Sequence, residues 1–204
     1  MELTKQQTKV SLFSVDEFYN LDLTNPYFNS HLITYIGNKR RLAPFLYKGF
    51  SKVREKIGKK KLVVLDGFVG SGAAARLLKA LASEMHVNDL EDYAETVNRA
   101  YLANQSEINI EELGKYINWL NANKLKTKSS KIGFIEKNYA PENDKRVKDG
   151  ERVFYTTNNA RIIDNVRCLI DDIPEKYRHF CLAALINELP RSRAGAVSDV
   201  NRRA

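Results

Sequence analysis

The chain has 204 residues, which suits one α/β domain with an insertion or two small domains. Hydrophobic residues make up 43% and charged residues 28%, and no apolar run reaches the roughly 18 residues of a transmembrane helix. The polar start also lacks the apolar core of a signal peptide, so we expect a cytoplasmic protein with no membrane partner.

The formal net charge of +8 favours a polyanionic partner such as nucleic acid, because each Lys or Arg docked on a phosphate releases a condensed counterion. Plain solubility is the alternative explanation of the same charge. Cys168 and Cys181 show no CxxC spacing, so the sequence supports neither a disulfide framework nor a zinc site.

The first half of the chain predicts alternating strands and helices. Residues 1–30 look irregular, with turn chemistry at Asn25-Pro26. The elements expected after them are a helix over 41–57, a strand over 62–65, a helix over 73–81, a strand over 85–87 and a helix over 93–103. This βαβα order is typical of a parallel, doubly wound sheet, so we predict an α/β fold with a partial Rossmann-like sheet.

The second half predicts helix almost throughout. Segment 124–150 is polar and lysine-rich, 152–156 is a candidate strand, and Trp119 has the helical spacing of a core residue. The expected helices cover 110–120, 160–173 and 175–189. No strand alternates with these helices, so they predict a mostly helical insertion or second domain.

The end of the chain differs in composition. The last 16 residues carry four of the 14 arginines and none of the 19 lysines, without apolar periodicity. We therefore divide the chain into an N-terminal domain over 1–104, a mostly helical region over 105–188 and a basic tail over 189–204. A flexible tail is the simplest interpretation of the last segment.

A glycine-rich loop follows the first strand. The stretch Gly70-Ser71-Gly72-Ala73-Ala74-Ala75 fits G-x-G-x-x-A, a pattern that lets the backbone approach a ligand at a helix N-terminus. Asp89 follows about 20 residues later, after the next strand, where a carboxylate can accept both hydroxyls of a ribose. No Gly-Lys-Ser/Thr follows the loop, which excludes a Walker phosphate loop. A dinucleotide and S-adenosylmethionine remain as candidate ligands.

Asp66 favours S-adenosylmethionine. It stands at the strand end, four residues before Gly70, where the pyrophosphate of a dinucleotide would come close. A carboxylate beside two phosphate charges is unfavourable, whereas the ammonium and sulfonium groups of S-adenosylmethionine are compatible with it. The alternative is an Asp that only caps the turn.

Two motifs in order resemble those of one enzyme family. Residues 66–72, DGFVGSG, resemble the D-x-F-x-G-S/T-G motif of adenine-specific DNA methyltransferases related to the Dam enzyme. In that family Y-I-G-x-K-x-x-L precedes this motif, and residues 35–42, YIGNKRRL, match it. Segments 138–141 and 154–164 resemble a stretch that these enzymes carry before their catalytic motif. The resemblance, over about residues 30–188, implies a methyltransferase fold that methylates the exocyclic amine of adenine in double-stranded DNA, as in restriction-modification systems.

The resemblance also implies roles for individual residues. Gly67 departs from the family, which usually has a bulkier residue or proline there. The implied cofactor-binding residues are Tyr35 and Lys39, closing the pocket, then Asp66, Phe68, Gly70 and Gly72 around the methionine part, and Asp89 at the ribose. In the basic segment 124–148, amides and aromatic rings would touch bases while cations hold phosphates. The implied DNA-binding residues are Lys126, Lys128, Lys131, Asn138, Tyr139, Lys145 and Arg146. A solvated loop is the alternative for this segment.

The catalytic motif of the family, Asp/Asn/Ser-Pro-Pro-Tyr/Phe/Trp, is missing from these 204 residues. In the family it binds the adenine that has been flipped out of the duplex. The nearest string, Asn25-Pro26-Tyr27, has one proline too few and precedes residues 35–42, so we interpret it as a turn. We therefore assign no catalytic residue and no metal ligand.

Several interpretations of this absence stay open. The chain is expected to be a truncated or frame-shifted methyltransferase, or the N-terminal part of a split one whose partner chain supplies catalysis. An incomplete parallel sheet exposes an edge, so the chain alone is also a candidate for dimerisation. A non-catalytic DNA-binding or regulatory protein that keeps the cofactor fold is the alternative from another class. Asp66 and the match at 35–42 disfavour a nicotinamide-dependent oxidoreductase.

Overall fold

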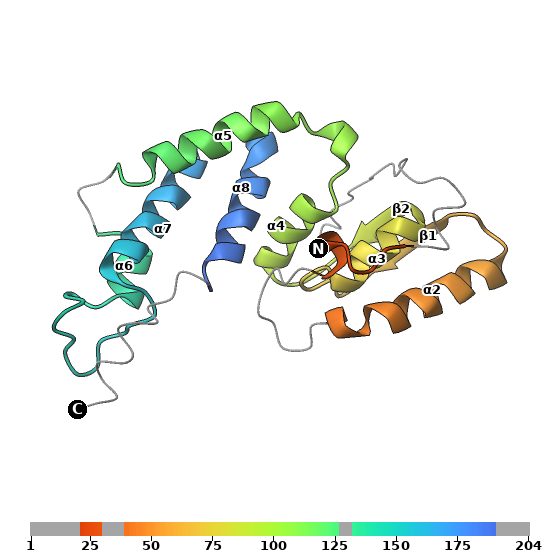
Figure 1. Cartoon of the computed structure of the whole chain (residues 1–204), viewed down its shortest axis with the longest axis horizontal. Helices are drawn as coiled ribbons and strands as arrows, with labels where there is room; N and C mark the ends of the chain where they lie inside the picture. Colours follow the sequence, from red (N-terminus) through yellow and green to blue (C-terminus); the bar gives the residue numbers. More distant parts are fainter. Residues whose placement is uncertain (1–20, 30–38, 127–131, 191–204) are drawn as a thin grey trace. The chain divides into compact units, whose positions relative to one another are not determined.

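The computed structural model describes residues 21–29, 39–126 and 132–190, and the chain divides into two compact units, 1–109 and 110–204 (Figure 1). We call them the N-terminal and C-terminal units and describe each by itself. The architecture is mixed α/β, mostly helical with a small parallel sheet, which confirms the predicted class in its coarse form. The predicted basic tail lies outside the described residues from 191 onward.

The N-terminal unit holds both strands of the described chain. Its elements are α1 (Pro26–Asn29), η2 (Lys39–Leu42), α2 (Ala43–Ile57), β1 (Leu62–Asp66), α3 (Ala73–Leu81), β2 (Ala82–Val87), α4 (Asp92–Tyr101) and η3 (Gln105–Glu107). The strand predicted over 85–87 begins three residues earlier, because α3 ends at Leu81 and the backbone turns extended at Ala82. The predicted βαβα order is therefore present.

The two strands pair in parallel and bury one face of the sheet. In the register of the pair, Val64 lies beside Met85 and Asp66 beside Val87, so both strands end at the same edge. The cluster on this face contains Val69, Ala75, Ala82, Met85, Ala94 and Leu102, with Val64 packed against it. Helices α3 and α4 thus cover the face of β1 that carries Val64.

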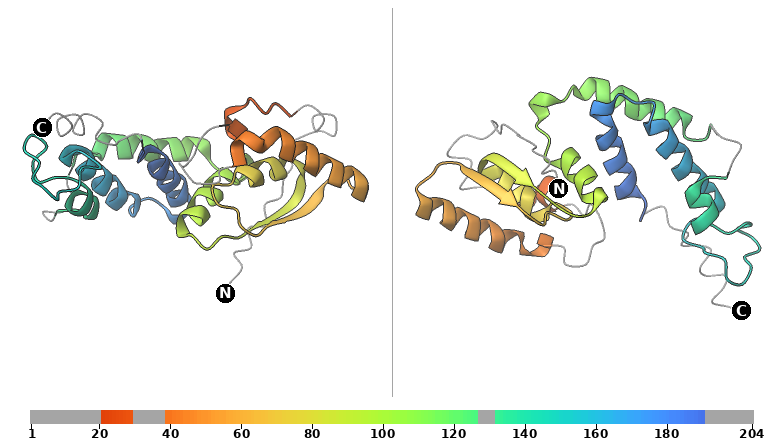
Figure 2. Two further views of the ribbon diagram at one scale, coloured as in Figure 1. Left: turned by 90° about the horizontal axis from the view of Figure 1, so that it is seen from below. Right: turned by 180° about the vertical axis from the view of Figure 1, so that it is seen from behind.

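The opposite face of the sheet is exposed. Val63 and Leu65 on β1 keep 65% and 66% of their surface open to solvent. In the register they lie beside Glu84 and His86 of β2, whose side chains contact each other at 2.9 Å. Figure 2, left, shows α2 and α3 together on one side of the strands. Among the described residues, no helix therefore covers the apolar side chains of β1 on this face.

A buried arginine fastens the N-terminal segment to α3. Arg76 is 2% exposed, donates from Nη1 to the carbonyl of Tyr27, and lies over the rings of Tyr27 and Tyr101. Tyr27 in turn donates to the carbonyl of Tyr101 at 2.7 Å, and burial raises the pKa of its hydroxyl to about 12. The string Asn25-Pro26-Tyr27 therefore has a packing role; it forms a turn that opens the short helix α1.

The regular elements of the C-terminal unit, within its described residues, are all helices. Its helices are α5 (Ile110–Asn123), α6 (Phe134–Tyr139), α7 (Thr157–Ile170) and α8 (Glu175–Glu188). The candidate strand 152–156 is wrong, because the N–H groups of Phe154 and Tyr155 both donate to the carbonyl of Tyr139 at 3.1 Å. Sequence periodicity also missed the short helix α6. Trp119, expected in the core, is 38% exposed.

Candidate functional site

The glycine loop between β1 and α3 has a backbone conformation that residues other than glycine would adopt only with strain. Gly70 and Gly72 adopt left-handed φ angles of 51° and 76°, and Gly72 stands at the start of α3. A Cβ on Gly72 would lie 2.2 Å from Oδ1 of Asn98, whereas one on Gly70 would meet nothing within 4 Å. The first glycine therefore faces open space, and the second allows α4 to pack close.

Hydrogen bonds tie this loop to the end of β2. The N–H of Asn88 donates to the carbonyl of Asp66 at 2.9 Å, and the N–H of Val69 donates to the carbonyl of Asn88 at 3.0 Å. The carboxylate of Asp89 accepts from the N–H of Gly70 at 2.7 Å. Asp89 and the glycine loop, separated in sequence, thus form one structure at the carboxyl ends of both strands, where parallel sheets place their ligands.

Two amides that sequence reasoning missed complete the loop. The Nδ2 of Asn98 donates to the carbonyls of Gly70 at 2.9 Å and of Ala94 at 2.8 Å, and its residue is 1% exposed. The Nδ2 of Asn88 donates to the carbonyl of Gly67 at 3.2 Å. Asn98 lies four residues after the buried Ala94, on the same face of α4. A polar residue on the apolar face of a helix was therefore the sequence signal that could have identified it.

The site is acidic. Partial burial raises the pKa of the Asp66 carboxyl above its ordinary value, and the nearby negative charge of Asp89 raises it further. A hydrogen bond from the N–H of Phe68, at 3.3 Å, and the positive charge of Lys39 act in the opposite direction. Two carboxylates thus lie close enough to interact beside the glycine loop. Such a pair favours a cationic ligand over a phosphate.

A hollow of about 430 Å³, part of it open to solvent, lies beside Asp89. Its lining includes an ion pair between Glu95 and Arg99, with N and O atoms 2.8 Å apart. The lining residues are Val69, Val87, Asn88, Asp89, Ala94, Glu95, Asn98 and Arg99. The hollow therefore combines an apolar wall with the carboxylate predicted to hold a ribose.

Two of the remaining predicted cofactor residues, Lys39 and Phe68, lie at the rim of the site. Phe68 is 94% exposed, and Lys39, at the start of η2, is exposed and close enough to act on the Asp66 charge. Tyr35 lies outside the described residues. The structure thus brings Lys39, Asp66 and Asp89 together with both glycines.

The predicted DNA-binding residues lie in the C-terminal unit, and two of them form an exposed cationic turn. Lys145 and Arg146 are exposed, and their N–H groups donate to the Oδ1 and the carbonyl of Asn143 at 2.9 and 3.0 Å. Lys126 is exposed just after α5. The other two predicted lysines, Lys128 and Lys131, lie outside the described residues.

Internal contacts hold Asn138 and Tyr139, the other two predicted residues. The Nδ2 of Asn138 donates to the carbonyl of Phe134, one turn earlier in α6, at 2.7 Å. The ring of Tyr139 contacts those of Phe134 and Phe154, with centroids 6.1 and 5.8 Å away. Arg152, which sequence reasoning missed, stacks over the Tyr139 ring at 5.5 Å. Phe134 and Phe154 are 68% and 49% exposed, so this aromatic cluster also forms surface.

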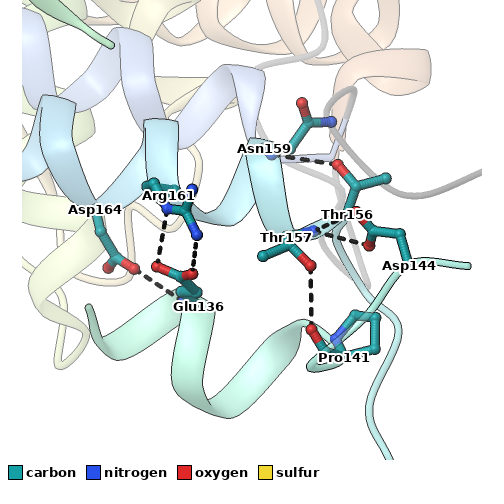
Figure 3. Close-up of polar contacts among 8 residues, drawn as sticks. All are labelled: Glu136, Pro141, Asp144, Thr156, Thr157, Asn159, Arg161 and Asp164. Atoms are coloured by element: carbon teal, nitrogen blue, oxygen red, sulfur yellow. Dashed lines mark hydrogen bonds and ion pairs between the residues drawn. The ribbon is translucent and has the colours of Figure 1, made fainter. Parts of the chain in front are cut away.

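Carboxylates brace the segment around the cationic turn (Figure 3). Asp164 of α7 accepts from the N–H groups of Ile135 and Glu136 at 3.0 and 2.8 Å, at the start of α6. Asp144 accepts from the N–H of Thr157 at 2.9 Å, at the start of α7. Figure 3 also shows the ion pair between Glu136 and Arg161, 2.7 Å apart. The turn is therefore flanked by two helices whose starts are hydrogen-bonded to carboxylates.

The described helices show no membrane-spanning segment, since none of them is both long and apolar enough. Among the same residues, no group of three or more His, Cys, Asp or Glu side chains has the arrangement of a metal site.

Comparison with known proteins identifies the family. The family model of D12 class N6 adenine-specific DNA methyltransferases matches residues 35–198, well over half of the chain. The chain is also 29% identical, over 161 residues, to the Type II methyltransferase M.NlaIII of Neisseria lactamica. That match covers 76% of this chain and 44% of the relative, so the chain spans less than half of the relative's length. No solved structure matches the chain. The chain belongs to the family of D12 class N6 adenine-specific DNA methyltransferases.

Proposed function

We propose that the chain provides the S-adenosylmethionine site and a DNA-recognition region of a site-specific adenine methyltransferase. The complete enzyme would transfer a methyl group to the exocyclic amine of adenine in double-stranded DNA, as part of a restriction-modification system in the cytoplasm. Family membership supports the reaction class, and the name of M.NlaIII supports the type II setting.

One observation carries the choice of cofactor: two carboxylates lie beside an open glycine turn. Asp66 and Asp89 act on each other electrostatically, and Asp89 holds the N–H of Gly70. A pyrophosphate brought to this turn would be repelled by both charges. An ammonium or sulfonium group would be attracted and would lower the raised pKa of Asp66.

The residues present fit S-adenosylmethionine. Nothing lies within 4 Å of the position that a Cβ of Gly70 would take, so the cofactor can approach the protein backbone there. Each oxygen of Asp89 accepts one N–H, from Gly70 at 2.7 Å and from Glu91 at 3.2 Å, and each keeps acceptor capacity for a ribose hydroxyl. When bound, the cofactor supplies an electrophilic methyl group on a positively charged sulfur. Asp66 would orient its methionine part, and Lys39 and Tyr35 would close the pocket.

The reaction needs groups that this sequence does not contain. In the complete enzyme a side-chain oxygen and a proline carbonyl would accept hydrogen bonds from the adenine amine and orient its lone pair toward the cofactor, which would supply the methyl group. Positioning of this kind supplies most of the acceleration. Asn25-Pro26-Tyr27 cannot do this, because Tyr27 is engaged with Arg76 and Tyr101. A segment equivalent to the rest of the relative would provide the motif.

The cationic turn would face the DNA. Lys145 and Arg146 are exposed, braced by Asp144, and followed by Arg152 on the aromatic cluster. Lysine and arginine here would hold phosphates, while Asn143 and the exposed rings would contact bases. The alternative, a solvated loop, predicts no loss of DNA affinity when these cations are removed.

Calorimetric titration of the chain with S-adenosylmethionine, with NAD as a parallel ligand, tests the proposal. We expect saturable binding of S-adenosylmethionine alone. Asp89→Asn keeps one oxygen to accept the Gly70 N–H but removes the charge and one ribose acceptor, so affinity should fall at least about tenfold. Asp92→Asn, the same change on an exposed acid in the first turn of α4, is the matched control.

The outcomes separate the candidate functions. Binding of NAD in place of S-adenosylmethionine would overturn the cofactor assignment. A folded chain that binds neither ligand, yet binds DNA, would favour the non-catalytic DNA-binding protein. That second candidate draws its support from the missing catalytic motif.

A further inference from the structure

We infer that the C-terminal unit binds a nucleotide in a hollow beside Trp119, the single tryptophan of the chain. The nucleotide carries a base with an exocyclic amine, and it is either free or part of a DNA strand. We call the hollow the Trp119 pocket. Its lining residues are Lys115, Tyr116 and Trp119 of α5, with Asp172 and Ile173 between α7 and α8. None of them belongs to the glycine site or to the cationic turn, so the inference goes beyond the proposed function.

An aromatic wall is the first observation. The sequence pattern predicts Trp119 in the core, yet its side chain is 38% exposed and lines a hollow of about 510 Å³, part of it open to solvent. Tyr116, one turn earlier on α5, lines the same hollow. Ile173, which is 1% exposed, adds an apolar surface. Exposed aromatic rings beside a hollow of this size offer a surface on which a planar base can stack.

Hydrogen bonds hold one side of the Trp119 pocket in place. Glu112, one turn before Tyr116, accepts from the hydroxyls of Tyr116 at 3.4 Å and Tyr177 at 2.6 Å. Lys176 donates to the same carboxylate at 3.2 Å. The rings of Tyr116 and Tyr177 also contact each other, with centroids 5.5 Å apart. Tyr116 is therefore held at its hydroxyl and at its ring before a ligand arrives, which lowers the entropy cost of binding.

Opposite charges at the pocket specify the ligand. Lys115 and Asp172 are both exposed among the lining residues. A lysine ammonium binds phosphate as a point charge, and a carboxylate accepts hydrogen bonds from the exocyclic amine of a base. A nucleotide of adenine, cytosine or guanine offers a flat ring, an anion and an amine together, whereas a thymine nucleotide lacks the amine. The net charge of +8 favours this anionic ligand over a zwitterion with similar parts, such as a free aromatic amino acid.

The fluorescence of Trp119 tests the inference, because the chain has no other tryptophan. Deoxyadenosine monophosphate is titrated into the full chain, with excitation outside the absorption band of the base. We expect saturable quenching as the base stacks on the indole. Thymidine monophosphate should bind at least about fivefold more weakly, because it offers no amine to Asp172. A second titration uses a DNA duplex with one extrahelical adenine, and the fully paired duplex is its control.

Two variants with matched controls assign the contacts. Asp172→Ala should remove the preference for deoxyadenosine monophosphate over thymidine monophosphate. Asp171→Ala is its control, because this neighbouring carboxylate pairs with Arg167 and does not line the pocket. Lys115→Ala should weaken the binding of both monophosphates at least about fivefold, through loss of the phosphate contact. Its control is Lys137→Ala, which replaces an exposed lysine of α6 in the same unit.

Calorimetry follows Trp119→Ala, which removes the fluorophore and should weaken binding at least about fivefold through loss of stacking. Circular dichroism checks that every variant folds. Asp89→Asn should leave the quenching unchanged, which separates the Trp119 pocket from the glycine site.

Quenching by the free monophosphate or by the extrahelical adenine supports the inference and identifies the source of the nucleotide. The inference is overturned if neither quenches Trp119, or if thymidine monophosphate binds as tightly as deoxyadenosine monophosphate. Binding of free phenylalanine in place of the nucleotide would also overturn it, as would equal nucleotide preference in Asp172→Ala and Asp171→Ala.

Discussion

At the scale of single residues, the candidate site is built by glycines and amides that shape the backbone. Gly70 and Gly72 adopt left-handed φ angles, and Asn98 fills the space beside the second glycine while it holds the carbonyl of the first. Asp66 and Asp89 supply the charge. Shape and charge therefore come from different residues and can be separated by substitution.

Gly72→Ala should destabilise the N-terminal unit by about 2 kcal/mol or more, because it combines a left-handed φ with a Cβ placed 2.2 Å from Asn98. Gly67→Ala in the same loop is the control, since its Cβ meets nothing within 4 Å and its φ is not positive. Its free energy of unfolding should change by less than about 0.5 kcal/mol. Urea denaturation measures both, and equal effects would contradict the argument.

Asp66→Asn should stabilise the unliganded chain at pH 7 and weaken binding of S-adenosylmethionine. The pKa of Asp66 is raised in the folded state, so its contribution to stability is complete at low pH and is lost as the pH rises through that pKa. Asparagine keeps the neutral form, so the Tm should rise at pH 7. The gain should vanish near pH 3, where wild-type Asp66 is protonated. A lower Tm for Asp66→Asn at pH 7 would contradict this.

At the scale of elements, local patterns account for most of what the sequence could predict. The strand at 62–65, the helix at 73–81 and the glycine loop between them follow from adjacent residues, and the structure contains all three. Segment 152–156 and helix α6 could not be predicted in the same way. Their geometry depends on the Tyr139 carbonyl, which lies 15 residues before Phe154, and on a carboxylate of α7.

The same limit applies to the candidate site. The spacing of the glycines and Asp89 could be read directly from the sequence. In the structure the N–H of Gly70 donates a hydrogen bond to Asp89. Asn98 could not be identified, because its role depends on how α4 packs against the loop. The family resemblance predicts Asn138 and Tyr139 as base contacts, and the structure shows in addition that both have contacts within the C-terminal unit.

Asp164→Ala should loosen helix α6 and cost about 1–2 kcal/mol of stability, because two N–H groups at the helix start lose their acceptor. The amides of Ile135 and Glu136 should exchange faster with deuterium than in the wild type. Asp171→Ala, at the end of α7, is the control. Its carboxylate pairs with exposed Arg167, and the free energy of unfolding should change by less than about 0.5 kcal/mol. Unchanged exchange at α6 would refute the capping role of Asp164.

At the scale of the whole molecule, the chain combines two compact units that carry different halves of the proposed function. The N-terminal unit holds the acidic glycine site, and the C-terminal unit holds the cationic turn. The net charge of +8 belongs to the entire chain, so it cannot by itself locate a DNA surface. Replacing cations in one unit, with a matched replacement in the other unit as the control, can locate the DNA surface.

Lys145→Ala combined with Arg146→Ala should weaken binding to duplex DNA, measured by fluorescence anisotropy at several salt concentrations. The slope of log affinity against log salt should become shallower by about 2, because each of the two cations would neutralise one phosphate in the wild type. The matched control is Lys52→Ala with Lys56→Ala, two exposed lysines of α2 in the other unit. Equal slopes for the two double variants would point to a diffuse charge effect and away from the cationic turn.

The contact between Tyr27 and Arg76 has a consequence for where translation begins. Arg76 belongs to α3, the helix that follows Gly72, so the carbonyl and ring of Tyr27 help to fix the helix that carries the glycine loop. A start codon downstream of residue 29 would yield a shorter translation product that keeps every residue of the loop. In that product the buried guanidinium of Arg76 would lose its contacts with the carbonyl and ring of Tyr27. Its cofactor loop would therefore be weakened by the loss of a segment about 40 residues away in the sequence.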